Sequence, residues 1–407
     1  MSTHTSFRLA TLAGSLLLSW PALAAESELA ARLEALEREL AQVKQELAAQ
    51  KTTQNQQAQA IASASNAAQE SAKTTVGGYG ELVYNRWDNR LAGGADKDQI
   101  DFRRFVLYLG HDFNERLRFR SELEFAHAKL AGDEVGNPSA PGAQGEFEVE
   151  QAQIEYDFGK NLLGRAGLML MPIGILNETH EPATFYGADR NPVETYIIPT
   201  TWREGGLGAN YRWADGFTLD ALFTSGLKLS AADGYAVRDG RQHVAKATAK
   251  DGAYTARLQW NGLPGLTAAA SLYYQNDMAQ GTDPTIGAGW LSEAHAIWNH
   301  GPFTLKALYA QWNVSGSGPK ATGANVQRGW YVEPSYKLNE RLGAFTRYNR
   351  WDNQAGDGTD SQYGQWNVGL NYWLDPGVVL KADYQWQTAP AGKNAFNGIN
   401  LGLGYQF

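Results

Sequence analysis

Cysteine is absent from the 407 residues of this sequence, and histidine occurs only seven times. The lack of cysteine excludes disulfides and thiolate nucleophiles. There is also no G-x-S-x-G motif, no phosphate-binding glycine loop and no histidine with an evident serine partner. His180 stands beside Glu181, but a metal site needs three or four ligands. We therefore expect no enzyme, no cofactor and no metal.

The sequence also lacks an apolar run long enough for a transmembrane helix, which needs about 20 residues. Near its start, Arg8 precedes the short apolar run LATLAGSLLLSW, followed by Pro21 and ALAA. This order is typical of a secretory signal peptide, which we expect to comprise residues 1–24. Export agrees with the avoidance of stray disulfides. A mature chain in a membrane would then have to cross it as a closed β-barrel.

Two short segments follow the expected cleavage site. In residues 25–50 an apolar residue recurs at spacings of four and three, at Leu29, Leu33, Leu36, Leu40, Val43 and Leu47. This a/d pattern over about three heptads predicts a periplasmic α-helical coiled coil, with a single amphipathic helix as the alternative. Residues 51–75 are rich in glutamine, alanine and serine, which predicts a flexible tether.

From residue 76 to residue 407 the pattern changes to alternating segments of about ten residues. In LRFRSELEF and GVVLKADYQW, apolar and polar residues alternate, as in strands with one apolar and one wet face. Aromatic residues near the strand ends predict interfacial girdles, among them Trp213, Trp260, Trp298, Tyr336, Trp351 and Trp373. Short turns alternate with longer loops. We predict an all-β membrane fold, a 16-stranded antiparallel transmembrane barrel.

The last alternating segment, GINLGLGYQF, ends on Phe407. An even number of strands places both ends of the barrel on the same rim. The last strand must therefore pair with the first to remove both sheet edges.

One long interruption separates the fifth and sixth expected strands. Residues 172–205 contain Pro172, Pro182, Pro192 and Pro199, which exclude a simple hairpin. The segment also carries apolar and aromatic residues such as Ile198 and Trp202. An exposed loop would leave these side chains in water. We predict that it folds into the barrel and narrows a pore that would otherwise be wide.

Charged residues mark the expected pore. We assign to the lumen wall Arg118, Arg120, Glu122, Arg165, Arg212, Arg257, Lys306, Arg347 and Lys381, and to the constriction His180, Glu181, Asp189, Arg190 and Arg203. A ladder of cations would favour anions. Carboxylates share the same face and the same loop, however, so opposed charges that pass small polar solutes are equally consistent with the pattern.

Several stretches resemble the phosphate-selective porin O and P family. They are DQIDFRRFVLYLGHDFNERLRFRSELEFA, VEQAQIEYDF, GRAGLMLMPIGILNE and TFYGADRN with TTWREGGLGANY, over residues 98–213. The resemblance rests on the paired Arg103 and Arg104 and on the Pro172-Ile173-Gly174 opening of the long loop. It implies a homotrimeric 16-stranded channel with an anion preference set by inward arginine and lysine, and it adds Arg104 to the pore residues.

The sequence thus predicts a porin in the outer membrane of a Gram-negative bacterium, in contact with its lipid, that lets small hydrophilic solutes or anions diffuse passively. The terminal Tyr405-Gln406-Phe407 resembles the signal read by the barrel-insertion machinery. The alternative is a general or sugar-type diffusion porin whose coiled coil also tethers the outer membrane to the cell wall. No nucleic-acid partner is expected.

Overall fold

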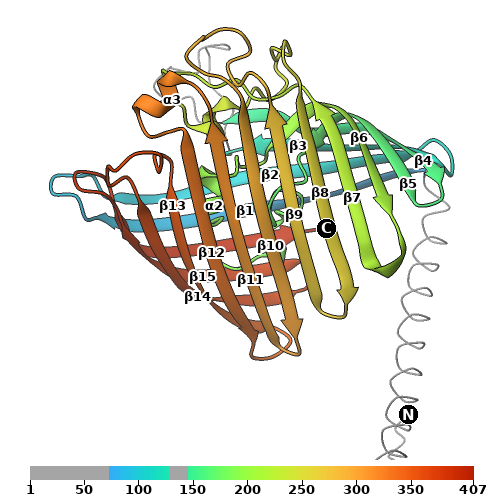
Figure 1. Ribbon diagram of the computed structural model, residues 1–407. Coiled ribbons are helices and arrows are strands. Elements are labelled where there is room, and N and C mark those ends of the chain that lie inside the picture. Colours follow the sequence, from blue (N-terminus) through green and yellow to red (C-terminus); the bar gives the residue numbers. More distant parts are fainter. Residues whose placement is uncertain (1–72, 129–144) are drawn as a thin grey trace, which may run out of the picture. The chain divides into compact units, whose positions relative to one another are not determined.

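The structure is a computed structural model that describes residues 73–128 and 145–407 (Figure 1). The predicted signal peptide and coiled coil lie outside the described residues, as does residue range 51–72 of the predicted tether. The first strand begins at Thr74, two residues before the predicted start of the barrel.

Within the described residues, sixteen antiparallel strands form one closed barrel, in which each strand pairs with its neighbours in the chain and β1 pairs with β16. The strands are β1 (Thr74–Asn89), β2 (Lys97–Asp112), β3 (Leu117–Ala126), β4 (Glu146–Gly159), β5 (Leu162–Leu170), β6 (Arg203–Arg212), β7 (Phe217–Thr224), β8 (Ala253–Leu263), β9 (Leu266–Gln275), β10 (Gly289–His300), β11 (Phe303–Val314), β12 (Val326–Lys337), β13 (Leu342–Asp352), β14 (Tyr363–Asp375), β15 (Val378–Thr388) and β16 (Phe396–Gln406). The predicted barrel is confirmed.

Short helices occur only in the connections of the part described. They are η1 (Pro182–Thr184), α2 (Val193–Tyr196), η2 (Ala214–Gly216), η3 (Val237–Gly240) and α3 (Ser317–Ala321). None of the helices among these residues has the length and apolar character needed to cross a bilayer.

The ring closes through the last strand. β16 pairs with β1 over eleven positions, from Tyr79 opposite Gln406 to Asn89 opposite Phe396. The closure continues one residue further, because Gly78 and Phe407 exchange both backbone hydrogen bonds, at 3.0 and 2.9 Å. The final aromatic residue thus takes part in the seam, and neither terminal strand presents an unpaired edge.

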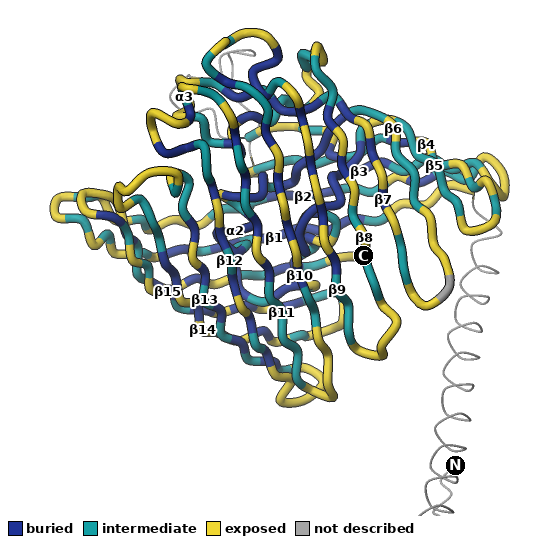
Figure 2. Tube along the Cα trace, in the orientation of Figure 1, coloured by how far each residue is buried: buried dark blue, intermediate teal, exposed yellow. Residues whose placement is uncertain are grey.

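Burial alternates along the strands, as Figure 2 shows in the alternating colours of the tube. On β15, Leu380 and Trp386 are exposed, whereas Lys381, Asp383 and Gln385 are buried. In a closed ring the buried face points inward, so the exposed apolar side chains form the outer surface. Such a continuous apolar surface suits contact with hydrocarbon rather than water.

Two of the predicted girdle residues lie inside the barrel instead. Trp351 is only 4 % exposed and stacks between Tyr196 and Tyr363, at centroid distances of 5.7 and 5.2 Å. The indole Nε1 of Trp373 donates to the Ala183 carbonyl at 3.4 Å. The prediction was wrong for both, because position near a strand end was weighed above the alternation, which turns both residues inward. Trp213, Trp298 and Tyr336 are exposed, as a girdle requires.

The main apolar core of the described residues lies inside the ring, around residues 171–202, which we call the inner loop (α2 lies within it in Figure 1). Met171, Ile197 and Trp202 of the inner loop are completely buried. They belong to one cluster with inward residues of the wall, such as Tyr273 on β9 and Trp312 on β11. The indole of Trp312 donates to the Ile197 carbonyl at 3.0 Å. The inner loop thus fills one side of the lumen.

The outward face generates a first prediction. Val368 is 48 % exposed on β14, between Trp366 and Tyr372 on the same outer face. Val368→Arg should lower the free energy of unfolding by about 2–4 kcal/mol in lipid vesicles, because a charge near the bilayer midplane is costly. Asn313→Arg, at the loop end of β11, should cost only about 0–1 kcal/mol. Urea unfolding followed by tryptophan fluorescence measures both, and equal costs would contradict the assignment of the outer face.

Candidate functional site

The inner loop borders two cavities in the lumen. The loop-side cavity has a volume of about 780 Å³ and is lined by inner-loop residues between Asp189 and Thr201, together with Asn353 and Asn394 near the long loops. The turn-side cavity has a volume of about 760 Å³ and is lined by Ala183, Thr184 and Tyr186 of the inner loop and by residues of the short turns. The inner loop thus borders open space both towards the long loops and towards the short turns.

Both cavities carry an excess of positive charge. The loop-side cavity is lined by five arginines and two carboxylates, namely Arg103, Arg104, Arg190, Arg238 and Arg241 with Glu124 and Asp189. The turn-side cavity is lined by Lys306, Lys337 and Arg341 with Glu340 and Asp375. Lys306 is 3.9 Å from Glu333 on β12. The path through the lumen is thus locally basic although the whole chain has a formal charge of -8.

The first turn of the inner loop is built around a buried carboxylate. Glu194, 3 % exposed, accepts hydrogen bonds from the backbone N–H groups of Ile175 and Leu176 at 2.8 and 2.7 Å and from the Tyr331 hydroxyl at 2.7 Å. Gly174 has a φ of 81°, and a Cβ there would lie 2.6 Å from a Glu194 oxygen. Both the left-handed backbone and the close approach require glycine. This explains the Pro-Ile-Gly opening that the sequence shows.

Predicted lumen residues of β13 and β15 hold the middle of the inner loop. Arg347 donates to the carbonyls of Tyr186 and Asp189 at 3.3 and 3.4 Å and pairs with Glu333 at 3.0 Å. Lys381 donates to the Gly187 carbonyl at 2.9 Å. Both side chains are buried, at 1 % and 5 % exposure. These two cations anchor the inner loop rather than face a solute.

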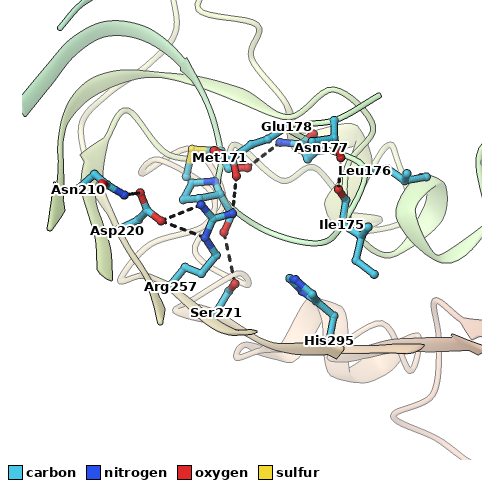
Figure 3. A network of polar contacts seen from close by, with 12 residues as sticks. Met171, Ile175, Leu176, Asn177, Glu178, Asn210, Asp220, Arg257, Ser271 and His295 are labelled. Atoms are coloured by element: carbon cyan, nitrogen blue, oxygen red, sulfur yellow. Dashed lines mark hydrogen bonds and ion pairs between the residues drawn. The ribbon is translucent and has the colours of Figure 1, made fainter. Parts of the chain in front are cut away.

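Arg257 on β8 anchors the start of the inner loop in the same way. Its guanidinium lies between Asp220 on β7 and Glu178 of the inner loop, as Figure 3 shows. Arg165 on β5 approaches the other Asp220 oxygen at 2.9 Å. The predicted residues Arg165 and Arg257 are therefore brought together around one buried carboxylate.

Residues of β1 and β2 also contact the inner loop, through Asp189 and Glu181. Arg104 pairs with Glu81 at 2.8 Å, and both are buried. Asn85 donates to Asp189 at 3.0 Å, and the Tyr108 hydroxyl donates to Glu181 at 3.2 Å. Arg190 lines the loop-side cavity next to Arg104 and Asp189.

Only four of the predicted pore residues line either cavity, namely Arg104, Asp189, Arg190 and Lys306. Arg118, Arg120, Arg203 and Arg212 are among those that line neither. Arg118 and Arg120 lie on β3 near the short-turn end, 3.9 Å from Glu155 and 2.9 Å from Asp112 respectively. Arg212 is exposed at the turn end of β6. Arg203 is buried and pairs with Glu148 at 2.7 Å. The structure thus places Arg118, Arg120 and Arg203 beside carboxylates and Arg212 at the rim.

Two arginines that line the loop-side cavity were missed from the sequence. Arg238 belongs to η3 and Arg241 follows it, in a long loop that carries no strand alternation. Arg238 lies 5.2 Å from the Tyr196 ring, at the end of the stack formed by Tyr196, Trp351 and Tyr363. Burial, together with Arg238, lowers the pKa of Arg241 to about 10, so it remains charged at neutral pH.

His180 and Glu122, from the predicted set, are brought together with a residue that the sequence analysis did not select. One ligand atom each of Glu122, Glu150 and His180 lie within 4.8 Å of one another. This cluster borders the inner loop on the side of β3 and β4.

The chain was compared with known proteins. A family described as Gram-negative porin matches residues 58–392. An uncharacterized protein of Aquifex aeolicus (strain VF5) is 31 % identical over 350 residues, which cover 76 % of this chain and 74 % of that protein. Three solved structures share the fold at low identity. An anion-selective porin from Comamonas acidovorans has a TM-score of 0.55 at 14 % identity, and the match covers 82 % of this chain and 99 % of that one. The outer membrane channel DcaP of Acinetobacter baumannii has a TM-score of 0.54 at 15 % identity, covering 82 % of this chain and 97 % of that one. OmpT of Vibrio cholerae in a trimer form has a TM-score of 0.51 at 12 % identity, covering 82 % of this chain and 99 % of that one.

The anchoring of the inner loop generates a second prediction. Tyr331→Phe removes the only side-chain donor that the barrel wall offers to Glu194 among the described contacts, while keeping the ring. A hydrogen bond to a buried carboxylate is worth about 1.5–3 kcal/mol. Hydrogen–deuterium exchange of residues 173–198 should therefore accelerate by at least about tenfold. Tyr336→Phe, on the outer face, is the matched control. Unchanged exchange in the Tyr331 variant would show that Glu194 does not couple the inner loop to the wall.

Proposed function

The chain belongs to the Gram-negative porin family, and on that premise we propose that it is an anion-preferring diffusion channel narrowed by its inner loop. The family and the fold support an outer-membrane location and passage of solutes through the barrel. The proposed path leads through the loop-side cavity, past the inner loop and out through the turn-side cavity. No chemical step is involved in this function.

The charge of the loop-side cavity carries the proposed preference. Five arginines and two carboxylates line that cavity. Arg104 is paired with Glu81 and Arg103 with Asp189, so the positive excess rests on Arg190, Arg238 and Arg241. Cations along a pore lower the barrier for an anion. The low-dielectric barrel wall focuses their field into the cavity. Phosphate is the solute that the resemblance to the phosphate-selective porin O and P family suggests. The paired Arg103 and Arg104 line the cavity, as do Asp189 and Arg190 of the resembling stretch TFYGADRN.

A sugar-type channel is the second candidate, and one observation favours it. Tyr196, Trp351 and Tyr363 form a continuous stack of rings along the loop-side cavity. Aromatic faces offer an apolar surface on which the ring of a neutral sugar can slide. This candidate requires permeation of neutral sugars without a preference between anions and cations.

The reversal potential across a planar bilayer with a salt gradient tests the third prediction. The full-length protein should favour anions, and Arg238→Glu should reduce the anion-to-cation ratio by about thirtyfold at low salt. A change of two charges about 8 Å from an ion in water raises the free energy of an anion by about 1 kcal/mol and lowers that of a cation by the same amount. Arg116→Glu is the matched control, because Arg116 is exposed in the β2–β3 turn and lines neither cavity. Addition of phosphate should block or shift the current.

Two outcomes would overturn the preference for anions. One is a wild-type reversal potential near zero, and the other is an equal shift in the Arg116 and Arg238 variants. A near-zero potential together with rapid swelling of proteoliposomes in neutral sugar would favour the sugar-type channel. Silence in the bilayer would contradict both candidates.

We further propose that the heptads of residues 25–50 hold a homotrimer together or link the barrel to the cell wall. The trimer form in which OmpT of Vibrio cholerae was solved is consistent with three copies. The fourth prediction is that deletion of residues 25–72 leaves the conductance of a single channel unchanged, because β1 begins at Thr74. If the heptads hold the trimer, the deletion should lower its melting temperature on native gels. If they link the barrel to the cell wall, it should abolish co-sedimentation with peptidoglycan. An equally stable trimer would exclude the first role, and unchanged co-sedimentation would exclude the second.

A further inference from the structure

Three buried side chains from separate elements converge at one edge of the inner loop. Glu122 comes from β3, Glu150 from β4 and His180 from the inner loop. Their exposures are 1 %, 1 % and 3 %. Nε2 of His180 lies 3.4 Å from Oε1 of Glu122 and 3.5 Å from Oε2 of Glu150. Two carboxylates and one imidazole thus point at a common space that water does not reach.

The orientation of the imidazole indicates what this space can hold. Nδ1 of His180 lies 3.1 Å from the Asn177 carbonyl, which can only accept, so Nδ1 carries the hydrogen. In the neutral ring Nε2 then presents a lone pair towards the two carboxylates. Neither Nε2 nor Oε2 of Glu150 has a hydrogen-bond partner. Oε1 of Glu122 has one donor, the Tyr79 hydroxyl at 3.3 Å. The two unpartnered acceptors that converge with it in a buried place require a cation between them, either a proton on Nε2 or a metal ion.

The distances fit a metal ion. Zinc binds histidine nitrogen at about 2.0–2.1 Å and carboxylate oxygen at about 2.0–2.2 Å, so two ligand atoms of a tetrahedral site lie about 3.4 Å apart. The two nitrogen–oxygen separations in the cluster have this length. A two-carboxylate, one-histidine set also leaves a fourth position for water. Calcium and magnesium fit less well, because they take six or more oxygen ligands.

The surroundings hold the three ligands in place. The Asn177 carbonyl fixes the tautomer of His180, which is how metal-binding histidines are usually oriented. The Gln151 amide donates to the second oxygen of Glu122 at 2.6 Å. A β-bulge lies here as well, because Gln151 pairs with Glu122 and Val149 with Leu123, which leaves Glu150 without a partner in register. Bulges of this kind re-aim a side chain.

We infer that Glu122, Glu150 and His180 form a binding site for a divalent transition-metal ion of the Zn²⁺ class. The ion would join the inner loop to β3 and β4, apart from its contacts with β13 and β15. Binding of the ion does not depend on the transport function. The further consequence, that the ion stabilises the width of the pore, rests on the proposed channel function.

The fifth prediction concerns metal content. Tag-free full-length protein in detergent is stripped with EDTA, incubated with Zn²⁺ or Co²⁺ alone and dialysed against metal-free buffer. We expect about one retained equivalent per chain by elemental analysis, and the visible absorption of four-coordinate Co²⁺. His180→Gln and Glu150→Gln should each weaken binding by more than about a hundredfold, since even outer partners of metal ligands contribute 10–100-fold.

The chain offers a matched control. His295 on β10 is also buried, at 8 %, and its Nδ1 lies 2.7 Å from Glu293, but this pair has no third ligand among the described residues. His295→Gln should retain the full equivalent of metal. Folding of each variant is checked by the heat-dependent shift of barrel proteins in gel electrophoresis. If the His180 variant does not fold, the metal stoichiometry and the Co²⁺ spectrum of the wild-type protein still show whether the chain binds a metal ion.

Two results would overturn the site. One is retention of less than a tenth of an equivalent by the wild-type protein, which would leave a proton on Nε2 as the cation between the carboxylates. The other is unchanged affinity in the folded His180→Gln variant. A wild-type channel that conducts but binds no metal would refute the metal site alone, whereas a protein that binds metal and does not conduct would refute the channel alone.

Discussion

The seam between β1 and β16 is the constraint on which the rest of this structure depends. In hydrocarbon every backbone donor and acceptor must find a partner within the protein, and a sheet meets that requirement only when it closes on itself. Closure divides each strand into an outer face that is suited to lipid and an inner face that borders the lumen. The polar side chains of the inner face then lie in a confined space, where they pair with each other and with the inner loop.

Two kinds of contact hold the inner loop inside the ring. Its apolar side chains pack against β9 to β13, which removes them from water, and its backbone carbonyls receive cations from the wall, such as Arg347 and Lys381. A buried cation needs compensating oxygen atoms, and an irregular loop needs donors for its free carbonyls. The buried cations of the wall and the free carbonyls of the inner loop therefore satisfy one another. The arginines that remain beside open space are those of the loop-side cavity.

Much of the fold could be predicted from the sequence because the two solvents of a barrel impose a period of two. That period located all sixteen strands and the irregular inner loop. The same period also places Trp351 on the inner face, because it lies four residues from the inward Arg347 on the same strand. The girdle prediction did not use this. It fails where a bulge intervenes. Glu150 and Gln153 are three residues apart on β4, so strict alternation would turn one of them outward, whereas the bulge beside Glu122 lets both be buried. Which cations pair with carboxylates depends on register across strands, which alternation does not reveal.

The contrast between an acidic chain and a basic lumen follows from the range of electrostatics. At physiological salt the field of a charge decays over about 8 Å, so a solute in the loop-side cavity responds to the side chains that line it and not to a formal charge of -8 summed over the whole chain. The same argument applies within the lumen. Arg347 and Glu333 pair at 3.0 Å and form a dipole whose field falls quickly, whereas Arg190 and Arg238 border the open space itself. Selectivity therefore has to be sought among cations that line the cavities and not in the total of inward charges.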